Sequence, residues 1–155
     1  MHRNTAAVAA ALRAAGCAGE VRELSVPART AAEAAEALSC PVGAIASSLV
    51  FLADGEPVLV LTSGAHRVDT AHTAAQLGVA DLTRPGAAEV RAATGQPIGG
   101  VAPVGHPAPL RTVVDVALAG FDVVWAAAGT PHAVFPTTFT ELLRICDAEP
   151  VAVVP

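Results

Sequence analysis

The sequence predicts a mixed α/β (α+β) fold, in which a curved, partly closed mixed β-sheet has helices packed outside it. Apolar residues make up 53% of the 155 residues and charged residues only 15%, a balance that favours a packed core over disorder. Strand-like and helix-like segments are mixed without a strict βαβ rhythm, and no repeat of 20–50 residues is present. We therefore expect residues 1–155 to form a single domain.

Cap and turn residues separate the elements in the first part of the chain. Asn4 or Thr5 can cap a helix that stops at Gly16. Thr30-Ala31-Ala32-Glu33 has the spacing of a capping box, and Asp54-Gly55 is a hairpin signal between two apolar runs. We expect helices over about 4–15 and 30–38, and strands over 21–26, 45–53 and 57–62.

The rest of the chain alternates short elements in the same way. Asp69 can cap a helix that stops at Gly78, and another helix ends at Gly95. Thr138-Phe139-Thr140-Glu141 repeats the capping-box spacing. We expect helices over about 70–77, 87–93 and 139–145, and strands over 79–82, 112–116, 123–127, 133–135 and 151–154, the last at a sheet edge.

The run from Ala92 to Leu110 carries no charge and contains four glycines and four prolines among 19 residues. Glycine lets the backbone approach a ligand and present its N–H groups, and proline stiffens the chain. This run therefore predicts a stiff, apolar loop with backbone donors, which is a suitable wall for a small-molecule pocket.

Charge and cysteine content exclude several classes of protein. The net charge is −5, all nine basic residues are arginine, and no lysine is present, so a broad nucleic-acid-binding face is not expected. Three cysteines without a close pair are typical of a reducing compartment. Arg13 interrupts the N-terminal apolar run, and no segment has the pattern of a membrane span. We expect a soluble, cytoplasmic protein.

Motifs for metal or nucleophilic chemistry are missing from the sequence. His66 and His72 are six residues apart, which does not place them on one helix face, and no G-x-S-x-G elbow, Rossmann fingerprint or P-loop occurs. Asp115 interrupts an apolar strand, so it is either buried and hydrogen-bonded or marks the strand end, in a supporting or a catalytic role. His106 can contact a ligand or brace the loop.

Several of these segments together resemble the YbaK/EbsC family, which contains aminoacyl-tRNA editing domains related to the insertion domain of prolyl-tRNA synthetase. The resemblance covers essentially the whole chain, and its most specific part is the Gly-Gly-x-x-Pro loop. The matching segments, in order, are 45–51, 58–64 with 67–69, 99–106, the strand that bears Asp115, and 125–129.

The resemblance implies a freestanding, trans-acting deacylase that hydrolyses the ester of a mischarged tRNA, Cys or Ala on tRNA-Pro above all. It implies no metal, cofactor or covalent nucleophile. The partners it implies are the tRNA 3′ end carrying a wrong amino acid and, as a further candidate, prolyl-tRNA synthetase, with no membrane and no DNA. The catalytic residues that it implies are Gly99, Gly100 and Val101, through their backbone, and Pro103, which makes the loop rigid. The substrate-binding candidates are Thr30, Ser47, Ser48, Gly105, His106, Asp115, Ala128 and Gly129.

One residue departs from the family pattern. Many members carry a lysine that contacts the tRNA terminus where this chain has Ser47, and loss of a charge-assisted contact costs roughly 1.5–3 kcal/mol. Arg67 or Arg111 can compensate if either side chain points toward the site. The alternative is therefore a catalytically weakened binding module for aminoacyl-adenosine, tRNA ends or a synthetase. A hydrolase of another small ester or amide is a third possibility.

Overall fold

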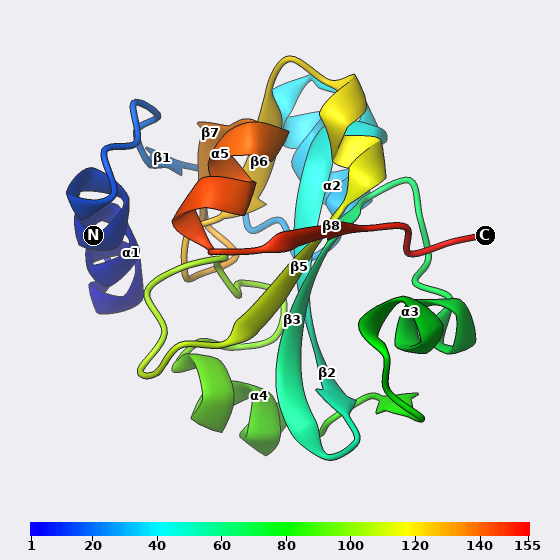
Figure 1. Ribbon diagram of the computed structural model, residues 1–155. Helices are drawn as coiled ribbons and strands as arrows, with labels where there is room; N and C mark the ends of the chain where they lie inside the picture. Colours follow the sequence, from blue (N-terminus) through cyan, green and yellow to red (C-terminus); the bar gives the residue numbers. More distant parts are fainter.

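A single mixed sheet of eight strands forms the centre of the protein, and the computed structural model describes all residues 1–155 (Figure 1). The strands are β1 (Arg22–Glu23), β2 (Ile45–Ala53), β3 (Glu56–Ser63), β4 (Leu82–Thr83), β5 (Arg111–Asp115), β6 (Val124–Ala127), β7 (Ala133–Thr137) and β8 (Glu149–Val151). The helices are α1 (Arg3–Ala14), α2 (Ala31–Leu38), α3 (Thr70–Leu77), α4 (Ala87–Thr94) and α5 (Phe139–Ile145), with short 3₁₀ turns η1 (Val42–Ala44) and η2 (Val116–Gly120).

The strand order is β1-β7-β6-β2-β3-β5-β8, and β4 pairs with the far end of β2. The β2–β3 hairpin is antiparallel, whereas β3–β5, β5–β8 and β2–β6 are parallel. The edge strands β1 and β8 do not pair with each other, so the sheet is not closed into a barrel. The helices are arranged around the sheet (Figure 1), which confirms the predicted mixed α/β class. None of them has both the length and the apolar character that crossing a membrane requires.

An opening in the sheet positions the candidate site. Strand β6 pairs with β2 only at Ile45 and Ala46, and β4 pairs with it only at Leu52 and Ala53. No strand covers that edge of β2 over residues 47–51. The hairpin partner β3 continues along the opposite edge, so β2 stays in place while its free edge borders a cavity.

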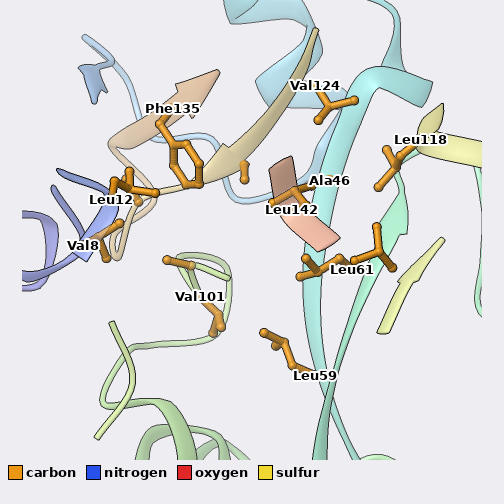
Figure 2. Close-up of a cluster of buried hydrophobic side chains, with 14 of the residues drawn as sticks. Val8, Leu12, Ala46, Leu59, Leu61, Val101, Leu118, Val124, Phe135 and Leu142 are labelled. Atoms are coloured by element: carbon orange, nitrogen blue, oxygen red, sulfur yellow. The ribbon is translucent and has the colours of Figure 1, made fainter. Parts of the chain in front are cut away.

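The larger core holds together α1, α5, the sheet and the Gly/Pro loop (Figure 2). Val8 and Leu12 of α1 and Leu142 of α5 belong to it, and so do Val101 and Ala102 of the loop. Burial of apolar side chains contributes about 25 cal/mol per Å² of surface. The loop is therefore anchored by packing and is not a free surface segment. A second cluster lies around α3, β4 and β8, and a small third cluster lies beneath α2.

Most predicted elements are confirmed. Strand β2 has the predicted bounds, Thr30 and Asp69 cap α2 and α3, and Gly78 ends α3 in the left-handed conformation. Helix α1 is capped by the ring of His2, which accepts from the Asn4 amide, where we predicted a cap at Asn4 or Thr5.

The weaker strand predictions were wrong in their bounds. The first strand shortens from 21–26 to 22–23, because only Arg22 and Glu23 pair with β7 at this sheet edge. The segment predicted over 79–82 pairs at 82–83, and the last strand lies at 149–151 in place of 151–154. Neither 3₁₀ turn was predicted.

The three cysteines form no disulfide and are all partly buried. Burial, with a smaller contribution from the nearby Cys17, raises the pKa of Cys146 to about 12. Burial also raises the pKa of Cys17 and that of Cys40. Since the thiolate is the reactive form, these residues act as small apolar side chains.

Candidate functional site

A cavity of about 340 Å³ lies where β2 separates from β6. Its walls are formed by β2, β6, the end of β3, the first residues of α2, the Gly/Pro loop, and the turn between β6 and β7. The segment Arg84-Pro85 borders it as well. A volume in this range is typical of a small-molecule site.

Several cavity-lining residues have backbone N–H groups with no hydrogen-bond partner within the protein, and three of them, Ile98, Gly99 and Val101, belong to the Gly/Pro loop. Gly99 and Val101 line the cavity, and neither amide donates to any protein acceptor. The two amides that alternate with them are engaged, because Gly100 donates to the Pro97 carbonyl at 3.0 Å and Ala102 donates to Gln96 Oε1 at 2.6 Å. The loop therefore leaves the donors of Gly99 and Val101, and that of the neighbouring Ile98, without a protein partner and available to a ligand.

Gln96 holds the loop in this shape. The residue is 2% exposed, and its side-chain amide oxygen accepts from the Ala102 N–H. Thr94 Oγ1 accepts from the backbone N–H of Gln96 and also donates to nearby carbonyls, which fixes the base of the loop. Sequence reasoning missed Gln96, because a glutamine beside a glycine and a proline carries no motif of its own.

The two glycines of the loop are needed for different reasons. Gly99 has a φ angle of +89°, a backbone conformation that residues other than glycine rarely adopt. A Cβ on Gly100 would lie 2.7 Å from the Cα of Thr130 and 3.0 Å from the Cδ of Pro131. A side chain at this position would therefore force the loop away from the β6–β7 turn. The close approach of these two backbones forms one corner of the cavity.

Gly100 does not itself line the cavity, and neither do three other loop residues that we predicted for the site. Pro103 is buried, and its carbonyl accepts from the Cys146 thiol at 3.5 Å. Gly105 has φ +84° and packs beside Val8. His106 Nε2 donates to the Ala102 carbonyl at 2.7 Å, and burial lowers the pKa of its ring. Their contacts brace the loop, which is one of the two roles expected for His106, and the substrate contacts expected of Gly105 and His106 stay predictions.

Ala128 and Gly129 also lie behind the cavity wall. The Ala128 amide donates to the Ala133 carbonyl, and the Gly129 carbonyl accepts from the Asn4 side chain at 3.3 Å. Their sequence neighbours Ala127 and Thr130 provide the lining. The predicted pair therefore shapes the turn, and the residues on either side of it face the space.

Three predicted hydroxyl residues do line the cavity, namely Thr30, Ser47 and Ser48. Thr30 Oγ1 accepts from the Glu33 amide at 3.1 Å and is therefore occupied as a helix cap. The buried Oγ of Ser48 has no hydrogen-bond partner, which leaves an unsatisfied polar group beside the space. Ser47 lies opposite Thr62 in the β2–β3 register.

Asp115 is 1% exposed and lies behind the cavity, where its carboxylate accepts from four donors. Both expectations for it are met, because it is buried and hydrogen-bonded and it also ends β5. The donors are Ser63 N at 3.0 Å, Thr62 Oγ1 at 3.4 Å, Ala117 N at 2.9 Å and His66 Nδ1 at 2.8 Å.

The ring of His66, unlike Asp115, does line the cavity. From the sequence we considered this histidine only as a metal ligand, because its partner carboxylate lies 49 residues away in the chain. No group of three or more His, Cys, Asp or Glu side chains comes together as a metal site would require.

Two arginines, Arg29 and Arg84, line the cavity and form no ion pair. The guanidinium of Arg84 lies 5.2 Å from the centroid of the Phe51 ring, a cation–π contact. We predicted Arg67 or Arg111 for this role. Neither lines the cavity, and Arg111 instead donates to the Leu77 carbonyl at 3.1 Å.

The fold and this cavity define a small α/β domain with a candidate binding site between β2, β6 and the Gly/Pro loop. The chain belongs to the aminoacyl-tRNA editing domain family, whose model matches residues 25–145. The expected resemblance to editing domains is thereby confirmed.

Relatives agree with this assignment. The uncharacterized protein YwhH of Bacillus subtilis (strain 168) is 31% identical over 79% of this chain and 78% of that protein. A proline--tRNA ligase of Nitratidesulfovibrio vulgaris is 33% identical over 70% of this chain, which spans only 19% of the ligase. The crystal structure of a candidate trans-editing enzyme for prolyl tRNA synthetase is 39% identical, with a TM-score of 0.93, and the match covers 100% of this chain and 99% of that one.

Proposed function

We propose that this protein is a trans-acting deacylase that hydrolyses the ester of a mischarged tRNA, with Cys or Ala on tRNA-Pro as its substrates. The observation that supports this most is the pair of unengaged amides, Gly99 and Val101, in the wall of a cavity. The family assignment supplies the substrate class, because the matching domain is an aminoacyl-tRNA editing domain.

In the proposed mechanism the amides of Gly99 and Val101 hold the ester carbonyl oxygen and stabilise the negative charge that develops on it. Removing one donor of this kind typically costs a factor of 10²–10³ in rate. The Gln96 side chain and the buried Val101 keep these donors fixed before substrate binds, so little reorganisation is needed. Pro103, which is buried within the same loop, keeps it stiff.

The proposed preference for a small amino acid rests on the lining of the cavity near α2. Ala31, Ala34, Ile45, Ala46 and Trp125 form an apolar wall there. A wall of this kind rejects a side chain by size, at only ~1–3 kcal/mol per methylene. The wall therefore supports Ala and Cys as a class and does not distinguish strongly between them.

We assign the contact with the tRNA terminus to Arg29 and Arg84, in place of the absent family lysine. Both arginines line the cavity and neither forms an ion pair with a carboxylate, so both guanidinium groups can pair with phosphate. The net charge of −5 limits the contact to this local pair. Ser47 and the unpartnered hydroxyl of Ser48 can add hydrogen bonds to the ribose or the aminoacyl group.

A deacylation panel tests the proposal. Purified protein is incubated with tRNA-Pro charged with Cys, Ala, Ser or Pro, and the remaining ester is measured over time. We expect rapid loss of Cys or Ala and retention of Pro. Retention of all four esters at the uncatalysed rate would contradict the proposal.

The second candidate function is a binding module without catalysis, and the replacement of the family lysine by Ser47 favours it. The same panel separates the two. A module leaves every ester intact but binds the tRNA or an aminoacyl-adenosine analogue measurably. Binding without hydrolysis would therefore establish the module.

A further inference from the structure

His66 and Asp115 form a pair that the proposed function has not used. Asp115 Oδ2 lies 2.8 Å from His66 Nδ1. The carboxylate is 1% exposed, whereas the histidine side chain is 29% exposed and lines the cavity. A buried carboxylate behind a histidine that reaches the site is the arrangement by which many hydrolases orient an imidazole.

The pair fixes which ring nitrogen is available. The Asp115 carboxylate also accepts from the backbone amides of Ser63 and Ala117, so it acts as an acceptor toward every neighbour. Nδ1 of His66 therefore carries the hydrogen and donates it. Nε2 of the neutral ring is left as an acceptor, and no protein group bonds to it.

The backbone around His66 is held firmly. The His66 amide donates to the Ser63 carbonyl at 2.9 Å, and the Ala65 amide donates to Ser63 Oγ at 3.3 Å. Ser63 Oγ in turn donates to the Gly43 carbonyl at 2.8 Å. The turn after β3 is thus fixed from both sides, so the ring is positioned before a ligand arrives.

The start of α2 connects this turn to the Gly/Pro loop. A Cβ on Gly64 would lie 2.7 Å from the Ala31 Cβ, and a Cβ on Gly99 would lie 3.8–3.9 Å from atoms of Arg29. Residues 29–31 therefore touch both segments. The imidazole and the free amides line one cavity on the two sides of this helix start.

We infer that His66 is the general base of the proposed deacylation, with Asp115 as its positioning residue; this inference rests on the proposed function. Nε2 takes a proton from a water molecule as the water oxygen bonds to the ester carbonyl carbon. The resulting oxyanion lies at the amides of Gly99 and Val101. When the bond from that carbon to the ribose oxygen breaks, Nε2–H returns the proton to the ribose oxygen. The products are the free amino acid and the tRNA 3′ end.

The test compares kcat and KM for His66→Asn and His66→Gln on the ester that the wild-type protein hydrolyses fastest. Asn can still donate an N–H to Asp115 but offers no base at the Nε2 position. His72→Asn is the matched control, since His72 lies on α3 outside the cavity. Circular dichroism and thermal unfolding give the folded fraction to which each rate is normalised.

We expect both His66 variants to lose about 10²–10⁴-fold in kcat, as general-base catalysis predicts, with KM changed less than about threefold. We also expect added imidazole to restore part of the activity of His66→Ala, which a merely structural role would not produce. The control variant keeps the wild-type kcat.

Three results would overturn the inference. If kcat is unchanged in the folded His66 variants, His66 is not the general base, and the deacylase proposal is unaffected. A rise in KM at constant kcat gives His66 a binding role instead. A wild-type protein that hydrolyses no ester refutes the deacylase proposal itself, and the general base with it.

Discussion

Substitution of Gly100 by alanine tests whether the close approach of two backbones sets the cavity. The new Cβ would lie 2.7 Å from Thr130 Cα, about 0.7 Å short of the 3.4 Å at which ordinary contact begins. The clash is with backbone, so the loop itself must move. Overpacking of this kind costs about 1–3 kcal/mol of stability, or roughly 2–4 °C in Tm per kcal/mol for a domain of this size.

The activity should fall much further than the stability. A displacement approaching 1 Å at a catalytic donor can cost about 10²-fold in rate, so kcat/KM of Gly100→Ala should fall by about that factor. Gly120→Ala is the matched control, because no atom lies within 4 Å of the added Cβ. Thermal unfolding and the deacylation assay are run on both variants. Wild-type kcat/KM and Tm in Gly100→Ala would refute the reasoning.

Three further predictions follow from the charges around the site. Ser47→Lys should tighten tRNA binding by about one to two decades, measured by fluorescence titration, and unchanged affinity would show that Ser47 lies away from the tRNA end. Arg84→Gln should weaken tRNA binding and reduce the slope of log K against log salt by about 0.7, while Arg67→Gln leaves that slope unchanged; an equal effect of both would argue against a local contact. Burial lowers the pKa of His106 in the folded protein below its ordinary value of 6.5, so as the pH falls the ring is protonated in the unfolded chain before it is protonated in the folded protein. The stability that the neutral ring contributes is therefore complete above about pH 6.5 and is lost as the pH falls below that value. Urea unfolding should show a smaller loss below that pH in His106→Gln, and identical pH profiles would contradict this.

Local signals in the sequence were sufficient for much of the fold. The hairpin at Asp54-Gly55 and the helix caps at Thr30 and Asp69 depend only on neighbouring residues, and all three formed as expected. The uncharged Gly/Pro run also predicted the wall of the cavity, since Gly99 and Val101 line it. Short strands at the sheet edges were placed less well, because their bounds depend on a distant partner strand.

The features of the site that were missed, such as the pairing of His66 with the predicted Asp115, depend on contacts between distant segments. His66 and Asp115 are 49 residues apart, and only the pairing of β3 with β5 brings them together. Arg29 and Arg84 line the cavity because the start of α2 and the end of β4 lie beside it in the fold, which no local pattern encodes. Two roles were open for His106 from the sequence, ligand contact and bracing of the loop, and its ring makes the bracing bond to the carbonyl of Ala102 inside its own loop.

The central claim is that the backbone amides of Gly99 and Val101 bind the acyl carbonyl oxygen. Its most direct test is an NMR titration of the ¹⁵N-labelled protein with a non-hydrolysable 3′-aminoacylamino-adenosine analogue. Engagement of a carbonyl oxygen should move the amide protons of Gly99 and Val101 downfield as the analogue binds, with small changes at Gly120. A saturating analogue that leaves both amides unmoved while other cavity residues shift would place the acyl group elsewhere and contradict the account.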